Sequence, residues 1–330
     1  MEAASTKSSK LYTIRPIPGK GQGLVTTTKI LKGTRILTES PAFRVPRDVS
    51  DIEAVEQVVN REVDRLSKAR QQAFHSLSNI HGTGASSALG IARTNVLPLG
   101  ADAREGGLFL EASRINHSCV HNAQNTWNTT LGQLTIHVFK DLEEGEEITI
   151  SYLEGSESYV ARQQRLKKSF GFDCTCELCS LPPDQRQESD QRLKEITRLD
   201  GLIGDGGRIT STPLACLREA HALLRLLEQA HIADARIPRL YYDVLQIAIA
   251  NGDQARAKVF AERACAARTV LEGADSPETI RLKEFAEKPA KHRLFETTEK
   301  WKQALKAVPE GLSELEFDDW LWRRKRPYLK

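Results

Sequence analysis

The chain has 330 residues, more than the usual size of a single hydrophobic core, so two domains are expected. Its 47 Lys and Arg residues against 44 Asp and Glu residues leave a formal net charge of +3, too balanced for a dedicated nucleic-acid binder. The start, MEAASTKSSK, lacks the apolar core of a secretory signal, and no run of about eighteen apolar residues predicts a membrane span. We therefore expect a soluble, intracellular protein whose residues 1–10 are disordered.

The first elements after this tail are β-strands followed by helix. Short β-rich runs from Leu11 to Ser40 are interrupted by glycines, which predicts strands joined by tight turns. From Ile52 to Leu77 apolar residues recur at helical spacing, after an Asp51 that can cap the first turn. We expect one helix here, inserted between strands.

Two further runs alternate between apolar and polar residues. They are Leu134 to Val138 and Ile148 to Tyr152, and an acidic turn from Asp141 to Glu147 separates them. This pattern predicts a β-hairpin.

The C-terminal half is expected to be helical. After Cys179 a polar, proline-marked linker places a boundary near Leu181, and strand signals almost vanish beyond it. The chain breaks again at Asn251 to Asp253, and the next helix, Ala255 to Glu272, has alanines at close spacing, as in helical-hairpin repeats.

Three cysteines in six residues, Cys174, Cys176 and Cys179, form a C-x-C-x-x-C set that leaves a tetrahedral zinc one ligand short. Cys119 is the best fourth candidate, because the other two cysteines sit at apolar positions of predicted helices. In a reducing compartment such a cluster indicates metal binding, although ordinary buried thiols are the alternative. Four protein ligands leave no open position, so the zinc is expected to be structural.

Four motifs give this sequence a family resemblance. They occur in the order GKGQGL at Gly19 to Leu24, RINHSC at Arg114 to Cys119, EGEEITISY at Glu144 to Tyr152, and GFDCTCELC at Gly171 to Cys179. This order resembles the SET-domain lysine methyltransferases, and most closely the MYND-associated branch and its fungal relatives. The resemblance covers roughly Leu11 to Leu181.

The resemblance implies an α+β fold in two parts. A SET domain is expected at residues 11–180, with a helical insertion at about 46–92 and a post-SET zinc loop at about 170–180. An all-α, TPR-like region of helical hairpins is expected at 181–330. The insertion lacks the cysteine-rich MYND finger.

It also implies an enzyme that transfers methyl groups from S-adenosylmethionine to lysines of a protein or peptide, histones included. Tyr152 matches the catalytic tyrosine, while Phe170 stands where several relatives carry a tyrosine, which leaves the methylation state open. Taken alone, Tyr152 reads as a half-buried strand residue. The cofactor contacts carried over are Lys20, Gly21, Gln22, Asn95, Asn116, His117, Tyr152 and Phe172.

A SET-fold module that binds a peptide without catalysis is the alternative function. We expect a monomer in the nucleus or cytoplasm, with no membrane or sequence-specific nucleic-acid partner. The basic run Trp320 to Arg326 is either a nuclear import signal or a helix end with a solvated face.

Overall fold

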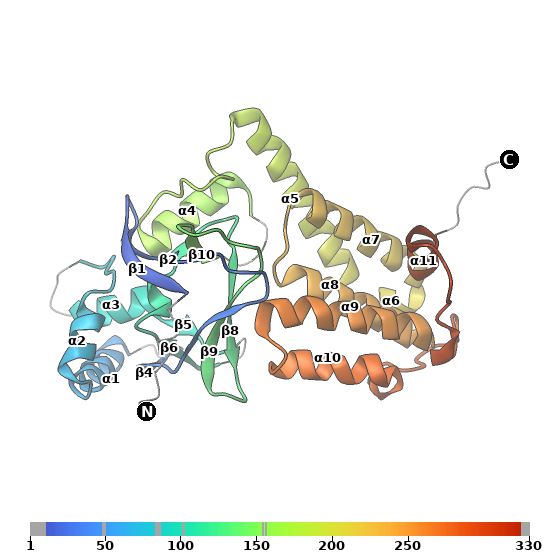
Figure 1. Cartoon of the computed structure of the whole chain (residues 1–330), viewed down its shortest axis with the longest axis horizontal. Coiled ribbons are helices and arrows are strands. Elements are labelled where there is room, and N and C mark those ends of the chain that lie inside the picture. Colours follow the sequence, from blue (N-terminus) through green and yellow to red (C-terminus); the bar gives the residue numbers. More distant parts are fainter. Residues whose placement is uncertain are drawn as a thin grey trace, which may run out of the picture. The chain divides into compact units, whose positions relative to one another are not determined.

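A computed structural model of the chain describes residues 11–47, 51–82, 87–100, 103–153, 155 and 157–324. The chain separates into two compact units, residues 1–153 with 162–179, and residues 154–161 with 180–330. The first unit combines short sheets with helices and the second is helical, so the predicted α+β class is confirmed (Figure 1). The predicted domain limits stay a prediction, and the tail at residues 1–10 lies outside the described residues.

The sheet that positions the site has four strands. Its order is β1 (Tyr12–Ile17), β2 (Gly21–Thr26), β10 (Glu147–Ile150) and β7 (Asn116–His117). β10 pairs antiparallel with β2 and parallel with β7, so it lies between them. The turn from β1 to β2 uses Gly19 and Gly21 at φ 74° and 77°, a region that suits glycine.

Two three-stranded sheets complete the β structure of the first unit, and buried aliphatic side chains of β9 and β10 contribute to its core. One has the order β3 (Arg35–Glu39), β9 (Gln133–Val138), β8 (Ala123–Asn128), and the other the order β4 (Phe43–Pro46), β6 (Glu105–Leu108), β5 (Leu97–Pro98).

The predicted β-hairpin between Leu134–Val138 and Ile148–Tyr152 is wrong. Both runs contain strands, but β9 pairs with β3 and β8, whereas β10 pairs with β2 and β7. The partner of β9 in a hairpin is β8, and Asn128 Oδ1 accepts backbone N–H bonds in the turn between them. Alternation shows that a segment is a half-buried strand, and it does not identify the partner strand.

The inserted region holds α1 (Ile52–Asp64), α2 (Lys68–His75) and α3 (Ser87–Asn95). Asp51 caps α1 as expected, since its Oδ1 accepts the Ala54 N–H at 3.0 Å. The single predicted helix is wrong, because Ser67 adopts an extended conformation (φ −62°, ψ 154°) that ends one helix and begins another. The hydrophobic period continues across the break because both helices bury residues in one cluster.

The second unit is a set of helices packed around its own apolar core. The chain breaks at Asn251 to Asp253 as predicted, and the Asp253 side chain caps the helix that follows. No helix among the described residues is long and apolar enough to cross a membrane. The helices are α5 (Pro183–Ile203), α6 (Arg208–Ser211), α7 (Pro213–Gln229), α8 (Arg236–Ala250), α9 (Gln254–Glu272), α10 (Pro277–Glu287) and α11 (Glu314–Leu321), while α4 (Tyr159–Phe170) spans the limit between the units.

The basic run at the C-terminal end is partly engaged in structure. Arg323 Nη2 donates to Asp253 Oδ2 at 2.7 Å, and its guanidinium lies 4.2 Å from the centre of the Trp301 ring. Arg324 pairs with Asp318 at 2.7 Å. These contacts favour a structural role for this part of the run, whose last two residues lie outside the described part of the chain.

Candidate functional site

The four predicted zinc ligands come together. The sulfur atoms of Cys119, Cys174, Cys176 and Cys179 all lie within 4.8 Å of one another. Cys119 Sγ is 3.9 Å from Cys174 Sγ and 3.6 Å from Cys179 Sγ. Zinc–sulfur bonds of about 2.3 Å in a tetrahedron separate the sulfurs by about 3.8 Å, so the donor set and its spacing fit a zinc ion.

Helix α4 holds the cysteine loop in place. The Gln163 side chain donates to the Cys174 carbonyl and accepts the Cys174 N–H, both at 2.8 Å. Arg162, which is buried, directs Nη2 towards Cys179 Sγ at 3.9 Å. Four thiolates around Zn²⁺ carry a net charge of −2, so a buried guanidinium beside them offsets part of that charge.

His117 connects the sulfur cluster to Tyr152. Its Nδ1 accepts the backbone N–H of Tyr152 at 3.0 Å, and its Nε2 lies 3.3 Å from Cys119 Sγ. Because Nδ1 is an acceptor, the neutral imidazole carries its proton on Nε2 and donates it to the sulfur. Both ring nitrogens of His117 are therefore engaged, and only its main chain can form hydrogen bonds with a cofactor.

Tyr152 lies in an aromatic cluster. Its ring centroid is 4.8 Å from that of Phe170, 6.4 Å from that of Phe172 and 5.4 Å from that of His117. The hydroxyl donates to the Ile115 carbonyl at 2.7 Å. Burial first, and then the nearby charge of Glu147, raise the pKa of this phenol far above its ordinary value. Tyr152 thus remains protonated at neutral pH and cannot serve as a base.

Lys20 and Asn116 meet at a carboxylate that the sequence analysis assigned only to an acidic turn. Glu147 Oε2 accepts from Lys20 Nζ at 2.7 Å, and Glu147 Oε1 accepts from Asn116 Nδ2 at 2.9 Å. Asn116 Nδ2 also donates to the Gln22 carbonyl at 3.2 Å. Register along β2, β10 and β7 brings these groups together, and the sequence carries no local signal for it.

Gly23 allows Lys20, Asn116 and Glu147 to meet in one group, which we call the polar junction. A Cβ at this position would lie 2.6 Å from Ile17 Cγ1, 2.8 Å from Asn116 Nδ2 and 3.2 Å from Glu147 Oε1. The absence of a side chain lets the polar groups approach the backbone of the glycine loop, as expected for a site that receives the polar end of a ligand.

Asn95 is held by its own surroundings. Its Nδ2 donates to the Ser78 and Ile91 carbonyls, each at 2.7 Å, and Ser113 Oγ donates to its backbone carbonyl at 3.0 Å. These bonds fix the end of α3 against the segment that leads to Asn116. A direct cofactor contact by Asn95 stays a prediction.

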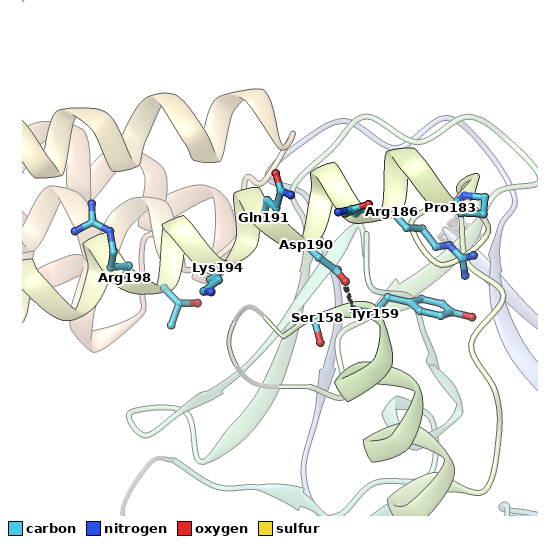
Figure 2. A pocket seen from close by; sticks show the side chains of 10 residues that line it. Ser158, Tyr159, Pro183, Arg186, Asp190, Gln191, Lys194 and Arg198 are labelled. Atoms are coloured by element: carbon cyan, nitrogen blue, oxygen red, sulfur yellow. Dashed lines mark hydrogen bonds between the residues drawn. The ribbon is translucent and has the colours of Figure 1, made fainter.

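A separate groove of about 800 Å³ lies in the second unit, between α5 and the start of α4 (Figure 2). Asp190 accepts the backbone N–H of Tyr159 at 2.8 Å and so caps α4. The Arg186 guanidinium lies 4.4 Å from the centre of the Tyr159 ring. None of the predicted catalytic, cofactor or metal residues lines this groove.

Comparison with known proteins places this geometry in a family. The SET domain family matches residues 21–153, which include Asn116, His117 and Tyr152. "Histone-lysine N-methyltransferase set5" of Schizosaccharomyces pombe is 33% identical over 94% of this chain and 94% of its own length. The chain belongs to the SET-domain family. This membership confirms the resemblance inferred from the four motifs.

Shorter matches cover parts of other SET proteins. "Histone-lysine N-methyltransferase ATXR4" of Arabidopsis thaliana is 32% identical over 34% of this chain and 34% of its own length. "Protein-lysine N-trimethyltransferase SMYD5" of Mus musculus is 36% identical over 24% of this chain and 20% of its own length. All three names describe lysine methyltransferases, in agreement with the predicted enzyme class.

Proposed function

We propose that this SET protein is an S-adenosylmethionine-dependent protein-lysine N-methyltransferase with one structural zinc ion. The observation that supports this most directly is Tyr152, whose ring packs among those of Phe170, Phe172 and His117. A protonated phenol in an aromatic enclosure suits the positioning of an amine while bulk water is kept away.

Five of the eight cofactor residues carried over from the family form two groups. Lys20, Asn116 and the backbone near Gln22 surround a polar junction that suits the charged amino-acid end of the cofactor. Phe172 and the main chain of His117 provide an aromatic and a backbone surface that suit its adenine. We propose that Gly21 contributes through the turn that it forms at φ 77°. Asn95 is proposed to support the segment that leads to Asn116, since Ser113 donates to its backbone carbonyl.

The cofactor supplies a methyl group bonded to a positively charged sulfur. Transfer requires a neutral lysine amine whose lone pair forms the new N–C bond while the C–S electron pair returns to sulfur. The Tyr152 hydroxyl donates its hydrogen bond to the Ile115 carbonyl, so its oxygen is left as an acceptor for an amine N–H. Because the pKa of Tyr152 is raised, the phenol orients the amine and does not deprotonate it. The amine loses its own proton because a buried cation is costly in such an enclosure.

We assign zinc to Cys119, Cys174, Cys176 and Cys179. With four sulfur ligands the metal has no open position, so its role is to hold the loop that carries Phe172 against the segment that carries His117. The substrate is proposed to be a lysine of a protein, with histones as first candidates because the Schizosaccharomyces pombe relative is named for histone lysine methylation. Action in the nucleus follows from that proposal.

The test is methyl transfer from tritiated S-adenosylmethionine to core histones and to total soluble protein, with the zinc-loaded full chain. Tyr152→Phe keeps the ring packing and removes the hydroxyl, so activity should fall at least about a hundredfold. Binding of S-adenosylhomocysteine should change little, since the same ring remains. Tyr12→Phe is the matched control, because it removes another largely buried hydroxyl of the same unit, one bonded to Glu111.

The two readings of the fold give different results. Wild type that binds S-adenosylhomocysteine but labels no protein would favour the peptide-binding module without catalysis. Tyr152→Phe with wild-type activity would overturn the assigned role of the tyrosine. Loss of activity in Tyr12→Phe as well would show that buried hydroxyls matter only for the fold.

A further inference from the structure

The carboxylate of Glu147 lies at the centre of the polar junction, and none of the motif assignments gives it a role. Glu147 is the first residue of β10, opposite Val25 of β2, and its backbone carbonyl is held by Asn122 Nδ2 at 2.9 Å. Strand pairing and this hydrogen bond therefore fix the backbone from which the carboxylate extends. Its side chain is 19% exposed, so it is partly shielded from water and still open to a ligand.

The two hydrogen bonds of the Asn116 amide define its orientation. Nδ2 donates to Glu147 Oε1 at 2.9 Å and to the Gln22 carbonyl at 3.2 Å. Both partners are acceptors only, so the NH₂ group must face them. Asn116 Oδ1 is then turned away from Glu147, and it has no donor among the described residues. The junction thus presents a free acceptor next to a fixed negative charge.

Glu147 also fixes the position of the Lys20 ammonium at the junction. Lys20 Nζ lies 2.7 Å from Glu147 Oε2, and the lysine side chain is 34% exposed, so part of this side chain faces solvent. A lysine at the tip of a glycine turn otherwise samples many rotamers, and the carboxylate holds it near the amide. One anion therefore places an acceptor oxygen and a cation side by side.

An amino-acid group carries a positive ammonium and a negative carboxylate on neighbouring atoms. Its ammonium complements Asn116 Oδ1 and the Glu147 charge, and its carboxylate complements Lys20. We propose that Glu147 is a positioning residue that prepares Lys20 and Asn116 for the zwitterionic end of the cofactor. This inference rests on the proposed function, since it assumes that S-adenosylmethionine binds at this junction.

Two ligands separate this role from a general effect on the site. S-adenosylhomocysteine carries the amino-acid end, whereas 5′-methylthioadenosine has the adenosine and the sulfur without it. Calorimetric titration of both into the zinc-loaded full chain should show that Glu147→Ala weakens the first about tenfold or more. Affinity for 5′-methylthioadenosine should stay within about twofold. Glu147→Gln should give a smaller loss, because its Oε1 can still accept from Asn116.

Glu143→Ala is the matched control. Glu143 is in the same acidic segment and pairs with Lys29 at 2.6 Å, but both side chains are more than half exposed. Its removal should leave both affinities unchanged. Thermal unfolding of each variant checks the fold, and Glu147→Gln keeps the test informative if Glu147→Ala is unstable.

The outcomes are distinct. Equal affinity of wild type and Glu147→Ala for S-adenosylhomocysteine would overturn the role of Glu147 and leave the proposed function standing. An equal loss for both ligands would also overturn it, because the effect would then not concern the amino-acid end. A folded, zinc-containing wild type that binds neither ligand would overturn the proposed function and this inference together.

Discussion

Removal of the fourth cysteine tests the sulfur cluster most directly. Cys119→Ser replaces a thiolate with a hydroxyl, which is a poor zinc ligand, and leaves three cysteines on one short loop. A metal bound by both Cys119 and Cys174 would close a loop of 55 residues. For a cross-link of that length, chain entropy contributes about 4 kcal/mol to stability.

That free energy predicts a measurable shift in melting. For a unit of this size about 4 kcal/mol corresponds to a decrease in Tm of about 8 to 16 °C. The assay is differential scanning calorimetry with zinc content measured by atomic emission on the same samples. Cys265→Ser is the matched control, because this half-buried thiol lies on α9 outside the cluster and donates to the Thr279 carbonyl at 3.7 Å.

The reasoning also predicts a loss of cofactor binding. Without Cys119 Sγ, His117 Nε2 loses its thiolate acceptor, and the loop that carries Phe172 loses its metal link to the His117 segment. Weakened binding of S-adenosylhomocysteine should therefore accompany the loss of zinc. A Cys119→Ser protein that retains one zinc per chain and melts within about 2 °C of wild type would refute this account of the cluster.

Three further predictions concern Gly23, Phe170 and Asp243. Gly23→Ala should weaken S-adenosylhomocysteine binding at least about tenfold in calorimetry, because the new Cβ meets Asn116 Nδ2 at 2.8 Å; unchanged binding would show that the junction can relax. Phe170→Tyr should shift products towards lower methylation in mass spectrometry, because a hydroxyl near Tyr152 can hold the amine and occupy space for a methyl group. Burial raises the pKa of Asp243 from 3.8 to about 6, so the folded state binds this proton more tightly and stability falls as pH rises from about 4 to 6. Asp243→Asn should therefore stabilise the chain by about 1 to 2 kcal/mol at pH 8 in urea unfolding and by less than half as much at pH 4.5.

The parts of the fold that the sequence predicts are those with a local cause. Asp51 caps α1 because its side chain reaches a backbone N–H three residues away. The close spacing of Cys174, Cys176 and Cys179 needs little more than a short loop to bring the sulfurs together. Elimination among the six cysteines predicts Cys119 as the fourth ligand, and the structure places its sulfur beside theirs.

The parts that the sequence does not predict depend on partners distant along the chain. β9 and β10 follow one another with alternating residues, and yet each pairs in a different sheet. Glu147 has acidic neighbours, which predict an acidic turn, whereas strand register places its carboxylate between Lys20 and Asn116. The roles of the individual cofactor residues stay predictions, since they depend on a ligand and not only on the chain.

The distance along the chain between Lys20 and Glu147 also determines when this ion pair can form during synthesis of the protein. These partners are 127 residues apart, so a ribosome adding about 5 to 20 residues per second takes about 6 to 25 s to supply the second after the first. Until then β2 has β1 on one edge and no β10 on the other. The hairpin that carries the glycine turn must wait with an open strand edge, which leaves it exposed to wrong pairing in the nascent chain.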